Sequence, residues 1–533
     1  MNRTTAIIVG AGPAGCACAL SLARKGIECI VLERGQRPGE KNVASFVLLT
    51  DVLKHLIPDF LDDAPLERAV TEESILLLGK DDVVNIQSRF YRHLRDPSAF
   101  TAYRGKFDAW LACKAEEAGA QIITGATVTD LIMEDKSVRG VRTGDDELLA
   151  DVVIGADGVN SVVAEKSGLV SREDTSMFML AIKEVLDLPP ETIEERFNLL
   201  QNEGCCYTGI GYPSDDVGGA ITLYTNRDSI SLAIFGQIHM LADGGVSLHS
   251  RYTQLKEHPF IRACVKGSTL REYQAHIISD GGRIRLKDTV GNGVILCGDA
   301  GGFNNAVYVG VPPAMASGMM AAEATELALQ KNDFQRKTLK QYLTLMKKKT
   351  TLMESHAKAR KQSVWFERRR PKLQQYRNTI ALALDSYTHN VSTFMGKERP
   401  SSGGILYHGI IKDFIPAPMR WIISPFVKKG KDTDSTVDYG SGSDEGLEDR
   451  IGSVIIQKDT NPHITVDSSA CPECRNRQCI ISCPAGNYEW NEQDGSIIFN
   501  HEACLECGTC RYICDSVQWS YPLHGRGVRF RWG

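Results

Sequence analysis

Half of the cysteines in this chain are gathered in two short runs near its C-terminus. The two runs contain, in order, Cys471, Cys474, Cys479 and Cys483, and then Cys504, Cys507, Cys510 and Cys514. Two, four and three residues separate the cysteines of the first run, which Pro484 follows, and two, two and three separate those of the second. This spacing is close to the bacterial pattern that binds two [4Fe–4S] clusters. The runs therefore predict a protein that moves electrons one at a time.

In that pattern the fourth cysteine of each run completes the cluster of the other run. The expected ligand sets are therefore Cys471, Cys474, Cys479 and Cys514 for one cluster, and Cys504, Cys507, Cys510 and Cys483 for the other. The four-residue spacing in the first run departs from the pattern, so the second set matches it better. Four-cysteine zinc sites are the alternative, because they also use CxxC pairs. Zinc needs neither a third cysteine at two-residue spacing nor the following proline.

The length and composition of the chain exclude several classes of protein. With 533 residues it is long enough for two or three domains. An apolar content of 42% and a net charge of −5 describe an ordinary soluble protein, and no global positive charge supports nucleic-acid binding. We expect no signal or transit peptide, and the cysteine-rich runs and scattered remaining cysteines fit a reducing cytoplasm.

Residues 5–33 have the pattern of a strand, a tight turn, a helix and a second strand. The apolar strand leads directly into a glycine-rich turn that contains Gly10, Gly12, Pro13, Ala14 and Gly15. Glu33 ends the second strand, so the turn has the context that a dinucleotide-binding motif requires. In such a motif the glycines permit a tight turn, close approach of a pyrophosphate and close packing of helix on strand. The helix N-terminus would bind the phosphate, and Glu33 the ribose hydroxyls.

Two later strands also end in an aspartate beside glycines. The first leads to Asp157 and Gly158, and the second to Gly298, Asp299, Gly301 and Gly302. This design can place a carboxylate on a ribityl hydroxyl and backbone amides near a phosphate or flavin ring. Together the three motifs resemble the glutathione-reductase-type FAD fold of aromatic hydroxylases and geranylgeranyl reductases. In that group the counterpart of Arg104 approaches the flavin and that of Asp108 is structural; a surface ion pair and a helix cap are the simpler alternatives.

The predicted architecture combines an α/β part with α+β parts. The predicted regions are 1–165 with 285–395 as the FAD-binding domain, 166–284 as an inserted β-rich quinone or substrate domain, 396–431 as a candidate membrane-surface segment, 432–452 as an acidic linker, and 453–533 as a ferredoxin-like domain with two [4Fe–4S] clusters. Within the insert, residues 218–225 and 229–235 are expected to pair as strands around Asn226. The inserted sheet is expected to cover the flavin.

Three stretches bear on a membrane role. The uncharged stretch 300–322 is interrupted by glycines and two prolines, which favours a loop and helix against the cofactor over a membrane span. Residues 405–431 carry large apolar groups and a basic end, but three prolines prevent one long helix, so they suit the membrane surface or packing on the flavin domain. The basic runs 347–349 and 368–370 are either solvated faces or docking sites for an acidic protein or an anionic membrane.

Several stretches together resemble one family, the electron transfer flavoprotein:quinone oxidoreductases. They are residues 33–43, 298–303, 316–323, 483–488, 504–511 and 527–533. The whole chain resembles the flavoprotein and ferredoxin-like subunits of bacterial Fix-type complexes, joined in one polypeptide. The resemblance places Arg34, Lys41 and Asn42, in the loop after the second strand, at the FAD cofactor.

The resemblance implies an oxidoreductase that passes electrons from reduced electron transfer flavoprotein through [4Fe–4S] clusters and FAD to a membrane quinone, such as a menaquinone. It also implies a peripheral, monotopic position on the cytoplasmic face of the cell membrane. The alternatives are an electron-transfer subunit of a Fix-type bifurcating complex and a ferredoxin-fed reductase of prenyl double bonds. The sequence assigns no catalytic acid or base.

Two departures from the family pattern bear on these expectations. After Asn42 the family usually has a pair of glycines, where this chain has Ser45 and Phe46, so substrate access at this loop can differ. Many members hold a single cluster, for which the set Cys483, Cys504, Cys507 and Cys510 would suffice. The four further cysteines at ligand spacing predict two clusters in this chain.

Overall fold

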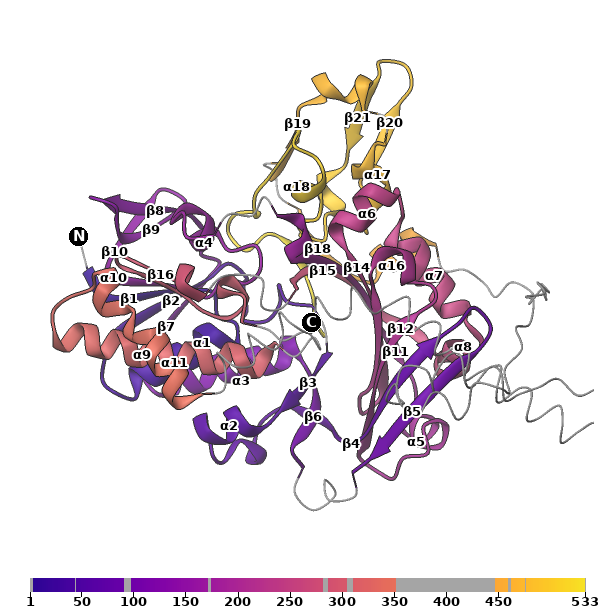
Figure 1. Cartoon of the computed structure of the whole chain (residues 1–533), viewed down its shortest axis with the longest axis horizontal. Coiled ribbons are helices and arrows are strands. Elements are labelled where there is room, and N and C mark those ends of the chain that lie inside the picture. The colour runs from indigo at the N-terminus through magenta and orange to yellow at the C-terminus, as the bar shows by residue number, and fades with distance from the viewer. Residues whose placement is uncertain are drawn as a thin grey trace, which may run out of the picture.

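The computed structural model describes residues 3–43, 45–90, 97–170, 174–280, 286–303, 310–350, 446–458, 462–474 and 476–532. These residues form two large β-sheets and a smaller cysteine-rich unit within residues 446–532, here called the C-terminal module (Figure 1). The predicted membrane-surface segment 396–431 and the basic run 368–370 lie outside the described residues. So do residues 351–395 of the predicted FAD-binding domain and 432–445 of the predicted linker.

The first sheet is mainly parallel. Its parallel strands lie in the order β17 (Val294–Leu296), β10 (Asp146–Gly155), β1 (Arg3–Val9), β2 (Cys29–Glu33) and β7 (Gln121–Thr124). The short strand β16 (Val290–Gly291) pairs with β17, and the hairpin of β8 (Val128–Glu134) and β9 (Ser137–Thr143) extends β10. The central strands are apolar on both faces, as buried parallel strands must be.

Alternate residues of the central strands face two different cores. Ile8 and Ile154 pack with the helices α1 (Pro13–Ala23), α3 (Arg104–Glu117) and α9 (Val311–Gln330). Ile7 and Val153 pack on the opposite face with β8, β9 and α4 (Val162–Lys166). Helix α9 approaches α1 closely because Gly318 has no Cβ, which would lie 2.0 Å from a backbone oxygen of α1. Part of the uncharged stretch is thus a buried helix.

No helix in the described ranges is long and apolar enough to cross a membrane. The predicted basic run 347–349 ends α11 (Gln341–Lys349), where all three lysines are exposed and Lys349 pairs with Glu323. This run is a solvated helix end. The remaining short elements on the two sheets are α2 (Asp51–Leu56), η1 (Phe60–Asp62), η3 (Thr175–Met177), η4 (Asp215–Val217), η5 (Leu286–Asp288), η6 (Gly298–Gly301) and α10 (Arg336–Leu339).

The second sheet is almost entirely antiparallel. Its strands lie in the order β15 (Thr269–Ser279), β11 (Phe178–Asp187), β14 (Ser229–Gln237), β13 (Ala220–Thr225), β12 (Glu203–Gly211), β4 (Leu66–Leu78), β6 (Ala99–Tyr103) and β3 (Ser45–Leu49), with β5 (Val83–Arg89) beside β4. Only β12 and β4 are parallel among these strands. The hairpin of β13 and β14 around Asn226 confirms the predicted strand pair.

The predicted bounds of the FAD-binding part need one correction. The sequence predicts residues 1–165 as one continuous part of it, but the strands β3 to β6 within this range belong to the second sheet. The chain leaves the first sheet after β2 and returns to it at β7. Pairing of β4 with the much later β12 decides this arrangement. A local sequence pattern does not predict such long-range pairing. The alternation of apolar residues shows which face of a strand is buried, but not which strand lies beside it.

Helices cover one face of the second sheet and leave the other face toward the first sheet. The covering helices are α5 (Pro190–Arg196), α6 (Ile238–Gly244), α7 (Leu248–Glu257) and α8 (Pro259–Val265). Apolar residues of β11, β14 and β15 form one core with them. Figure 1 shows the two sheets side by side, with the C-terminus of the chain between them.

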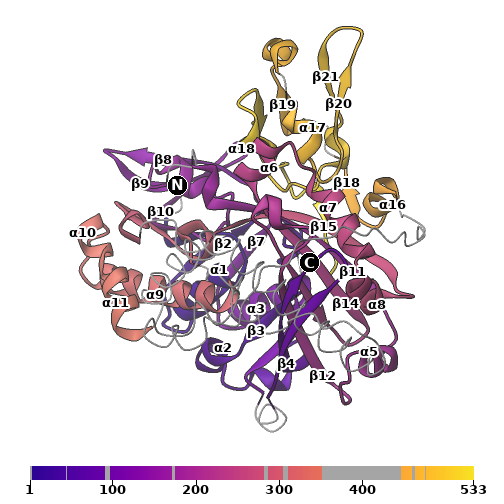
Figure 2. The same cartoon turned by 45° about the vertical axis from the view of Figure 1, so that its right-hand side comes forward.

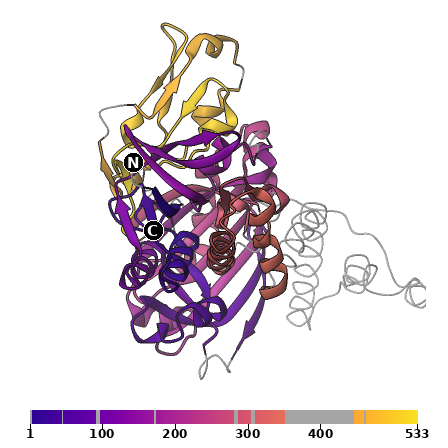
Figure 3. The same ribbon diagram turned by 90° about the vertical axis from the view of Figure 1, so that its left-hand side faces the viewer.

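The C-terminal module is small and built from short elements. They are α16 (Leu447–Gly452), β18 (Ile455–Gln457), β19 (Ile464–Val466), η10 (Ser468–Glu473), α17 (Gln478–Ser482), β20 (Tyr488–Asn491), β21 (Ser496–Phe499), η11 (His501–Ala503), α18 (Cys510–Ile513), β22 (Val517–Trp519) and β23 (Gly527–Arg529). Strand β18 pairs with β23, β19 with β22, and β20 with β21. Figure 2 and Figure 3 show the module above both sheets. Leu505, Val528 and Phe530 anchor it in the core of the second sheet.

Candidate functional site

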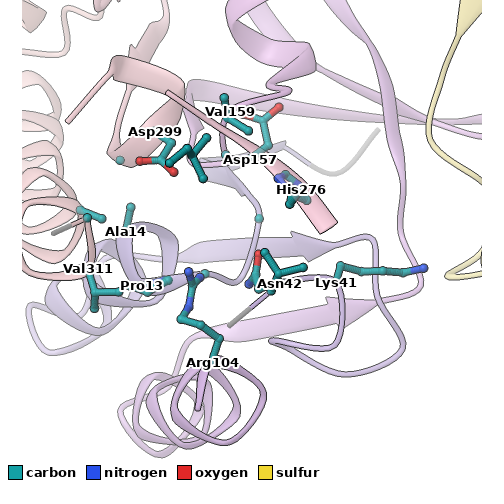
Figure 4. Close-up of a pocket in the computed structure, with 18 of the residues that line it drawn as sticks. Pro13, Ala14, Lys41, Asn42, Arg104, Asp157, Val159, His276, Asp299 and Val311 are labelled. Atoms are coloured by element: carbon teal, nitrogen blue, oxygen red, sulfur yellow. The ribbon is translucent and has the colours of Figure 1, made fainter. Parts of the chain in front are cut away.

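A pocket lies between the two sheets, at the carboxyl ends of β1, β10 and β17 (Figure 4). The predicted cofactor-binding residues in its wall are Gly10, Gly12, Pro13, Ala14, Glu33, Arg34, Lys41, Asn42, Arg104, Asp157, Gly158, Gly298 and Asp299. The predicted residues Gly15, Gly301 and Gly302 are not part of this wall. Ligands of α/β sheets bind at this edge, where carboxyl ends of strands meet helix N-termini.

The glycines of the first and third motifs shape the backbone around the pocket. Gly10 has a φ of +99°, and a Cβ there would lie 2.6 Å from a backbone oxygen of the loop after β10. Gly15 packs on this turn, since its Cβ would lie 2.0 Å from the Gly10 oxygen. Gly302, with a φ of +72°, ends η6, and Gly301 packs against the ring of Phe303. Gly15, Gly301 and Gly302 therefore support the pocket without lining it.

Glu33 connects the glycine-rich turn to the loop after β2. Its buried carboxylate accepts hydrogen bonds from the backbone N–H groups of Ala11 at 2.8 Å and Gly35 at 2.7 Å. Burial raises the pKa of Glu33, and these two hydrogen bonds oppose that shift. Because Glu33 also lines the pocket, its carboxylate can accept hydrogen bonds from hydroxyl groups of a ligand.

Arg104 enters the pocket from the first turn of α3 and is held by Asp108. The guanidinium donates to Asp108 through Nε at 3.0 Å and Nη2 at 2.8 Å. The fully buried Asp108 also accepts a hydrogen bond from Asn42 Nδ2 at 2.7 Å. Asp108 is thus structural, as predicted from the resemblance. Arg104 forms an ion pair, but one directed into the pocket (Figure 4).

Asp157 and Asp299 stand across the pocket from Arg104 (Figure 4). Asp157 accepts a hydrogen bond from the backbone N–H of Val163 at 3.1 Å, at the start of α4. Burial raises the pKa of Asp299, and the positive charge of Arg104 opposes this shift. Two carboxylates and one guanidinium therefore line the same pocket. The carboxylates can accept hydrogen bonds from hydroxyl groups, and the guanidinium can donate to an anionic or carbonyl group.

The sequence analysis missed the residues that the second sheet contributes to the pocket. They are Ala181, Lys183, Thr222, Tyr224, Ala233, Phe235, Gln274, His276, Ile277 and Ile278. The buried lysine after the apolar residues Phe178–Ile182 of β11 was the available signal, because a strand buried on both faces rarely carries a charge without a partner. Its meaning depends on which strands lie beside β11, which the local pattern does not give.

Four cysteines of the C-terminal module have neighbours from the set that is predicted for them. Burial, and then the neighbouring Cys507 thiol, raise the pKa of Cys483 to about 12. Burial also raises the pKa of Cys504, and the thiols of Cys507, Cys510 and Cys483 add to this shift. In the other set, burial and the nearby Cys514 raise the pKa of Cys479 to about 11. Burial, Cys514 and Cys474 also raise the pKa of Cys471. Cys471 and Cys479 thus lie near Cys514, and Cys483 and Cys504 near Cys507, while the complete ligand sets stay a prediction.

The set Cys483, Cys504, Cys507 and Cys510 surrounds a small cavity. The cavity is lined by these four residues and by apolar and aromatic side chains, among them Leu505 and Phe499. The backbone N–H of Asn487 lies 3.5 Å from Cys483 Sγ, and that of Glu506 lies 3.3 Å from Cys504 Sγ. Within the described ranges, no three His, Cys, Asp or Glu side chains converge closely enough to hold a single metal ion.

The loop that carries this set touches both sides of the pocket. The backbone oxygen of Cys507 accepts hydrogen bonds from Asn160 Nδ2 at 3.3 Å and from the Ile277 N–H at 3.4 Å. Asn160 follows the second motif of the first sheet, and Ile277 lies on β15 in the pocket wall. Tyr521 of the module is itself part of that wall. The cysteine set is therefore adjacent to the pocket.

Arg34 and Lys41 have a role that the sequence did not predict, in addition to their place in the pocket wall. Both line the pocket, but their charged groups pair with Glu506, which lies between two cysteines of the set. Arg34 also stacks over the ring of Tyr521. Although burial disfavours its ionised form, Lys41 and Arg34 hold the pKa of Glu506 below its usual range. Figure 4 shows Lys41 directed away from Arg104 and Asp299. The sequence could not show this, because Glu506 is distant in the chain.

Comparisons with known proteins agree with this arrangement. The family model for an FAD binding domain matches residues 3–201. Protein FixC of Salmonella typhi is 39% identical over 344 residues, which are 63% of this chain and 80% of the relative. The probable electron transfer flavoprotein-quinone oxidoreductase YdiS of Escherichia coli K12 is 40% identical over 347 residues, 64% of this chain and 80% of the relative.

Solved structures share the fold at low sequence identity. A geranylgeranyl bacteriochlorophyll reductase-like protein from Thermoplasma acidophilum superposes with a TM-score of 0.58 and 18% identity, covering 77% of this chain and 98% of that one. A variant of the halogenase PltM in complex with FAD gives a TM-score of 0.53 and 16% identity over 72% of this chain and 80% of that one. Taken with the relatives, these findings show that the chain is an FAD-binding oxidoreductase that belongs to the family of FixC and the electron transfer flavoprotein–quinone oxidoreductases.

Proposed function

We propose that this protein passes electrons from reduced electron transfer flavoprotein, through cysteine-bound [4Fe–4S] clusters and FAD, to a membrane quinone. One observation carries the proposal above the others. The backbone oxygen of Cys507 bonds at once to Asn160 and to Ile277, so a four-cysteine set lies directly against the FAD pocket. A one-electron centre beside a flavin is the arrangement that joins single-electron donors to a two-electron acceptor.

The pocket fits FAD residue by residue. The turn at Gly10 and Gly12 and the N-terminus of α1 suit the pyrophosphate, because free N–H groups and the helix dipole favour negative charge. Glu33 suits ribose hydroxyls, and Asp299 suits a hydroxyl of the ribityl chain. Arg104, held by Asp108, suits the flavin. When bound, FAD supplies the site that accepts one electron at a time and releases two.

The set Cys483, Cys504, Cys507 and Cys510 fits a [4Fe–4S] cluster. Its thiols surround a cavity, whereas the four sulfurs of a zinc site would each lie about 2.3 Å from one point. The N–H groups of Asn487 and Glu506 are directed at two of the sulfurs, which as iron-bound thiolates would accept them. The cluster, when bound, supplies a one-electron carrier.

The other set, with Cys471, Cys474, Cys479 and Cys514, is proposed to hold a second cluster. Cys474 is exposed, and the short strands β20 and β21 form a hairpin on this side of the module (Figure 2). A cluster here would lie nearer to solvent than the first, and we propose it as the point where electrons enter from the partner flavoprotein. The second sheet is proposed as the quinone domain, and the protein as a peripheral one on the cytoplasmic face of the cell membrane.

Anaerobic reduction of the purified holoprotein tests this function. Reduced electron transfer flavoprotein is added first, then a short-chain quinone, while flavin and cluster absorbance are recorded. The proposal expects reduction of the flavin by the partner and its reoxidation by the quinone. Reoxidation only by an isoprenoid lipid with double bonds would identify a prenyl reductase and reject the proposal. Iron and sulfide analysis tests the clusters separately: about eight irons for each chain are expected, and zinc in their place would reject them.

A further inference from the structure

The pocket-facing side of the second sheet carries a group of polar side chains in apolar surroundings. Lys183 on β11, Thr222 on β13 and Gln274 on β15 line the pocket together with Ser45 at the start of β3. We call these four residues the polar quartet. Their neighbours in the pocket wall include Ala181, Ala233, Phe235 and Ile278.

Strand register places the members of the quartet close together. Lys183 lies opposite Gln274 on one side and opposite Ala233 on the other, and Ala233 lies opposite Thr222. Residues opposite each other on neighbouring strands point to the same face of a sheet. Lys183 Nζ also donates a hydrogen bond to the backbone oxygen of Ser45 at 2.5 Å. The quartet therefore forms one polar surface with members on β3, β11, β13 and β15.

Three atoms of the quartet have no hydrogen-bond partner among the described residues. They are Ser45 Oγ, Thr222 Oγ1 and Gln274 Oε1. The exposed fractions of these side chains are 1%, 2% and 0%, so all three are buried in the wall of the pocket. A buried polar atom without a partner costs about 1–3 kcal/mol. Three such atoms around one pocket indicate a ligand that supplies the missing partners.

Lys183 places a charge next to these atoms. It is 5% exposed, and in the described structure its ammonium group makes no ion pair with a carboxylate. Burial lowers its pKa to about 7, with the nearby Cys206 opposing the shift. The other titratable groups on this face are Cys206, Glu73 opposite it on β4, Tyr224, whose ring lies 5.1 Å from Nζ, and two residues of β15. These two are Glu272, which accepts a hydrogen bond from Gln274 Nε2, and His276, whose pKa burial lowers to about 4. His276 is therefore neutral near pH 7, where Lys183 titrates.

We propose that the polar quartet binds the carbonyl end of the electron acceptor and that Lys183 donates a proton to its oxygen. This inference rests on the proposed function, in which the acceptor is a quinone. Reduction of a quinone to a quinol adds two electrons and two protons. When bound, the reduced flavin would supply both electrons and one proton. The second proton passes from the Lys183 ammonium to the quinone oxygen, as one N–H bond breaks and one O–H bond forms, and water then reprotonates the amine.

The remaining members of the quartet complete the binding site. The hydroxyl groups of Ser45 and Thr222 can donate hydrogen bonds to a carbonyl oxygen, and Gln274 Oε1 can accept one from the quinol hydroxyl that forms. Ser45 occupies the loop position at which this chain departs from the paired glycines of its family. The departure therefore adds a buried hydroxyl group to the pocket wall, beside the Lys183 ammonium group.

The oxidative half-reaction tests the role of Lys183 without the partner flavoprotein. Holoprotein is reduced chemically and mixed with either 2-methyl-1,4-naphthoquinone or ferricenium, a one-electron acceptor that takes up no proton. In Lys183→Met, reoxidation by the naphthoquinone is expected to slow on the order of 10²-fold, with the ferricenium rate unchanged. In the wild type the naphthoquinone rate should fall as pH rises through about 7. Lys183→Arg should remove that fall, because arginine stays protonated.

Binding gives a readout that does not depend on turnover. 2-Heptyl-4-hydroxyquinoline N-oxide, a redox-inert quinone analogue, is titrated into oxidised holoprotein while flavin absorbance is recorded. Lys183→Met and Thr222→Val should each weaken binding about tenfold, the loss expected for one hydrogen bond. Lys266→Met is the matched control, since Lys266 is exposed at the end of α8 on the far side of the sheet. It should match the wild type in both assays.

The outcomes separate the two levels of the proposal. Wild-type protein that reacts with ferricenium but not with the naphthoquinone contradicts the proposed function itself. Wild-type protein that reacts with both, together with a Lys183→Met variant of unchanged rate and unchanged binding, overturns the assignment of Lys183 and leaves the proposed function standing. A slowed rate with unchanged binding supports proton donation and overturns the binding role of Lys183.

Discussion

The ammonium group of Lys41 lies 2.9 Å from the carboxylate of Glu506, and the side chains are 4% and 1% exposed. Arg34 pairs with the second oxygen of the same carboxylate, and Lys41 also donates to the backbone oxygen of Val528 at 2.7 Å. Lys41 belongs to the loop after β2, whereas Glu506 belongs to the cysteine loop of the C-terminal module. This buried pair therefore fixes the module to the loop that borders the FAD pocket.

Removal of one partner should loosen the module. We expect Lys41→Met to lower the free energy of unfolding by about 3–5 kcal/mol, because it leaves the Glu506 carboxylate buried with a weaker counter-charge. Urea unfolding of the holoprotein, followed by the absorbance of flavin and clusters, measures the shift. Lys458→Met is the matched control, since Lys458 and Glu502 form an exposed pair within the module, with 75% and 47% exposure. Its effect should stay below about 1 kcal/mol. Equal effects of the two variants would contradict this role for Lys41.

Asn160 should couple the cysteine loop to the flavin side of the pocket. Its amide donates to the backbone oxygen of Cys507 and accepts a hydrogen bond from Tyr512 at 3.4 Å. Asn160→Ala should cost about 1–3 kcal/mol, because it leaves buried polar groups without partners. We expect faster hydrogen exchange of the loop amides and slower flavin reduction through the module, with iron and FAD contents unchanged. The control Asn85→Ala, on the exposed strand β5, should change neither the hydrogen exchange of the loop nor the rate of flavin reduction. Wild-type exchange in Asn160→Ala would reject the coupling.

The two cysteine sets should lose iron independently. Cys479→Ser is expected to leave about four of eight irons, and Cys507→Ser the other four, since each cluster needs all of its thiolates. Only Cys507→Ser should also perturb the flavin spectrum, because only Cys507 contacts the pocket wall. Iron analysis and low-temperature electron paramagnetic resonance of the reduced variants measure this. Loss of all iron in both variants would show that the sets do not fold separately around their metals.

The low pKa of Lys183 should make the free energy of unfolding depend on pH. Its pKa is about 7 in the folded protein and about 10.4 in an unfolded chain. Between these values unfolding takes up a proton, so the stability contributed at this position rises with pH, by up to about 1.4 kcal/mol per pH unit. Lys183→Met should therefore be more stable than the wild type at pH 7, and the difference should shrink toward pH 10. Urea unfolding at pH 7, 8 and 9 measures it; parallel curves would contradict a neutral buried lysine.

The FAD pocket could be predicted in outline because its signals are local. Gly10 is required by a positive φ and a 2.6 Å approach, and Glu33, Asp157 and Asp299 each end a strand of one parallel sheet. Carboxyl ends of parallel strands meet at one edge, so motifs that are distant in sequence converge. The ion pairs of Arg34 and Lys41 could not be predicted, since their partner Glu506 lies far away in the chain, in the C-terminal module. Gly15, Gly301 and Gly302 support the pocket from behind, a distinction that the motif does not encode.

The sequence by itself determined the parts with short-range geometry: the glycine-rich turn, the strand-end carboxylates and the two sets of four cysteines. Cysteine spacing predicts which three thiols of each run can share a cluster, because a few residues of backbone separate them. Only the tertiary structure decided that β3 to β6 join the second sheet, that Cys507 bonds to both sides of the pocket, and that Lys183 stands among Ser45, Thr222 and Gln274. These relations depend on pairing between strands far apart in the chain. A local pattern records which face of a strand is buried, but not which distant strand or loop lies against it.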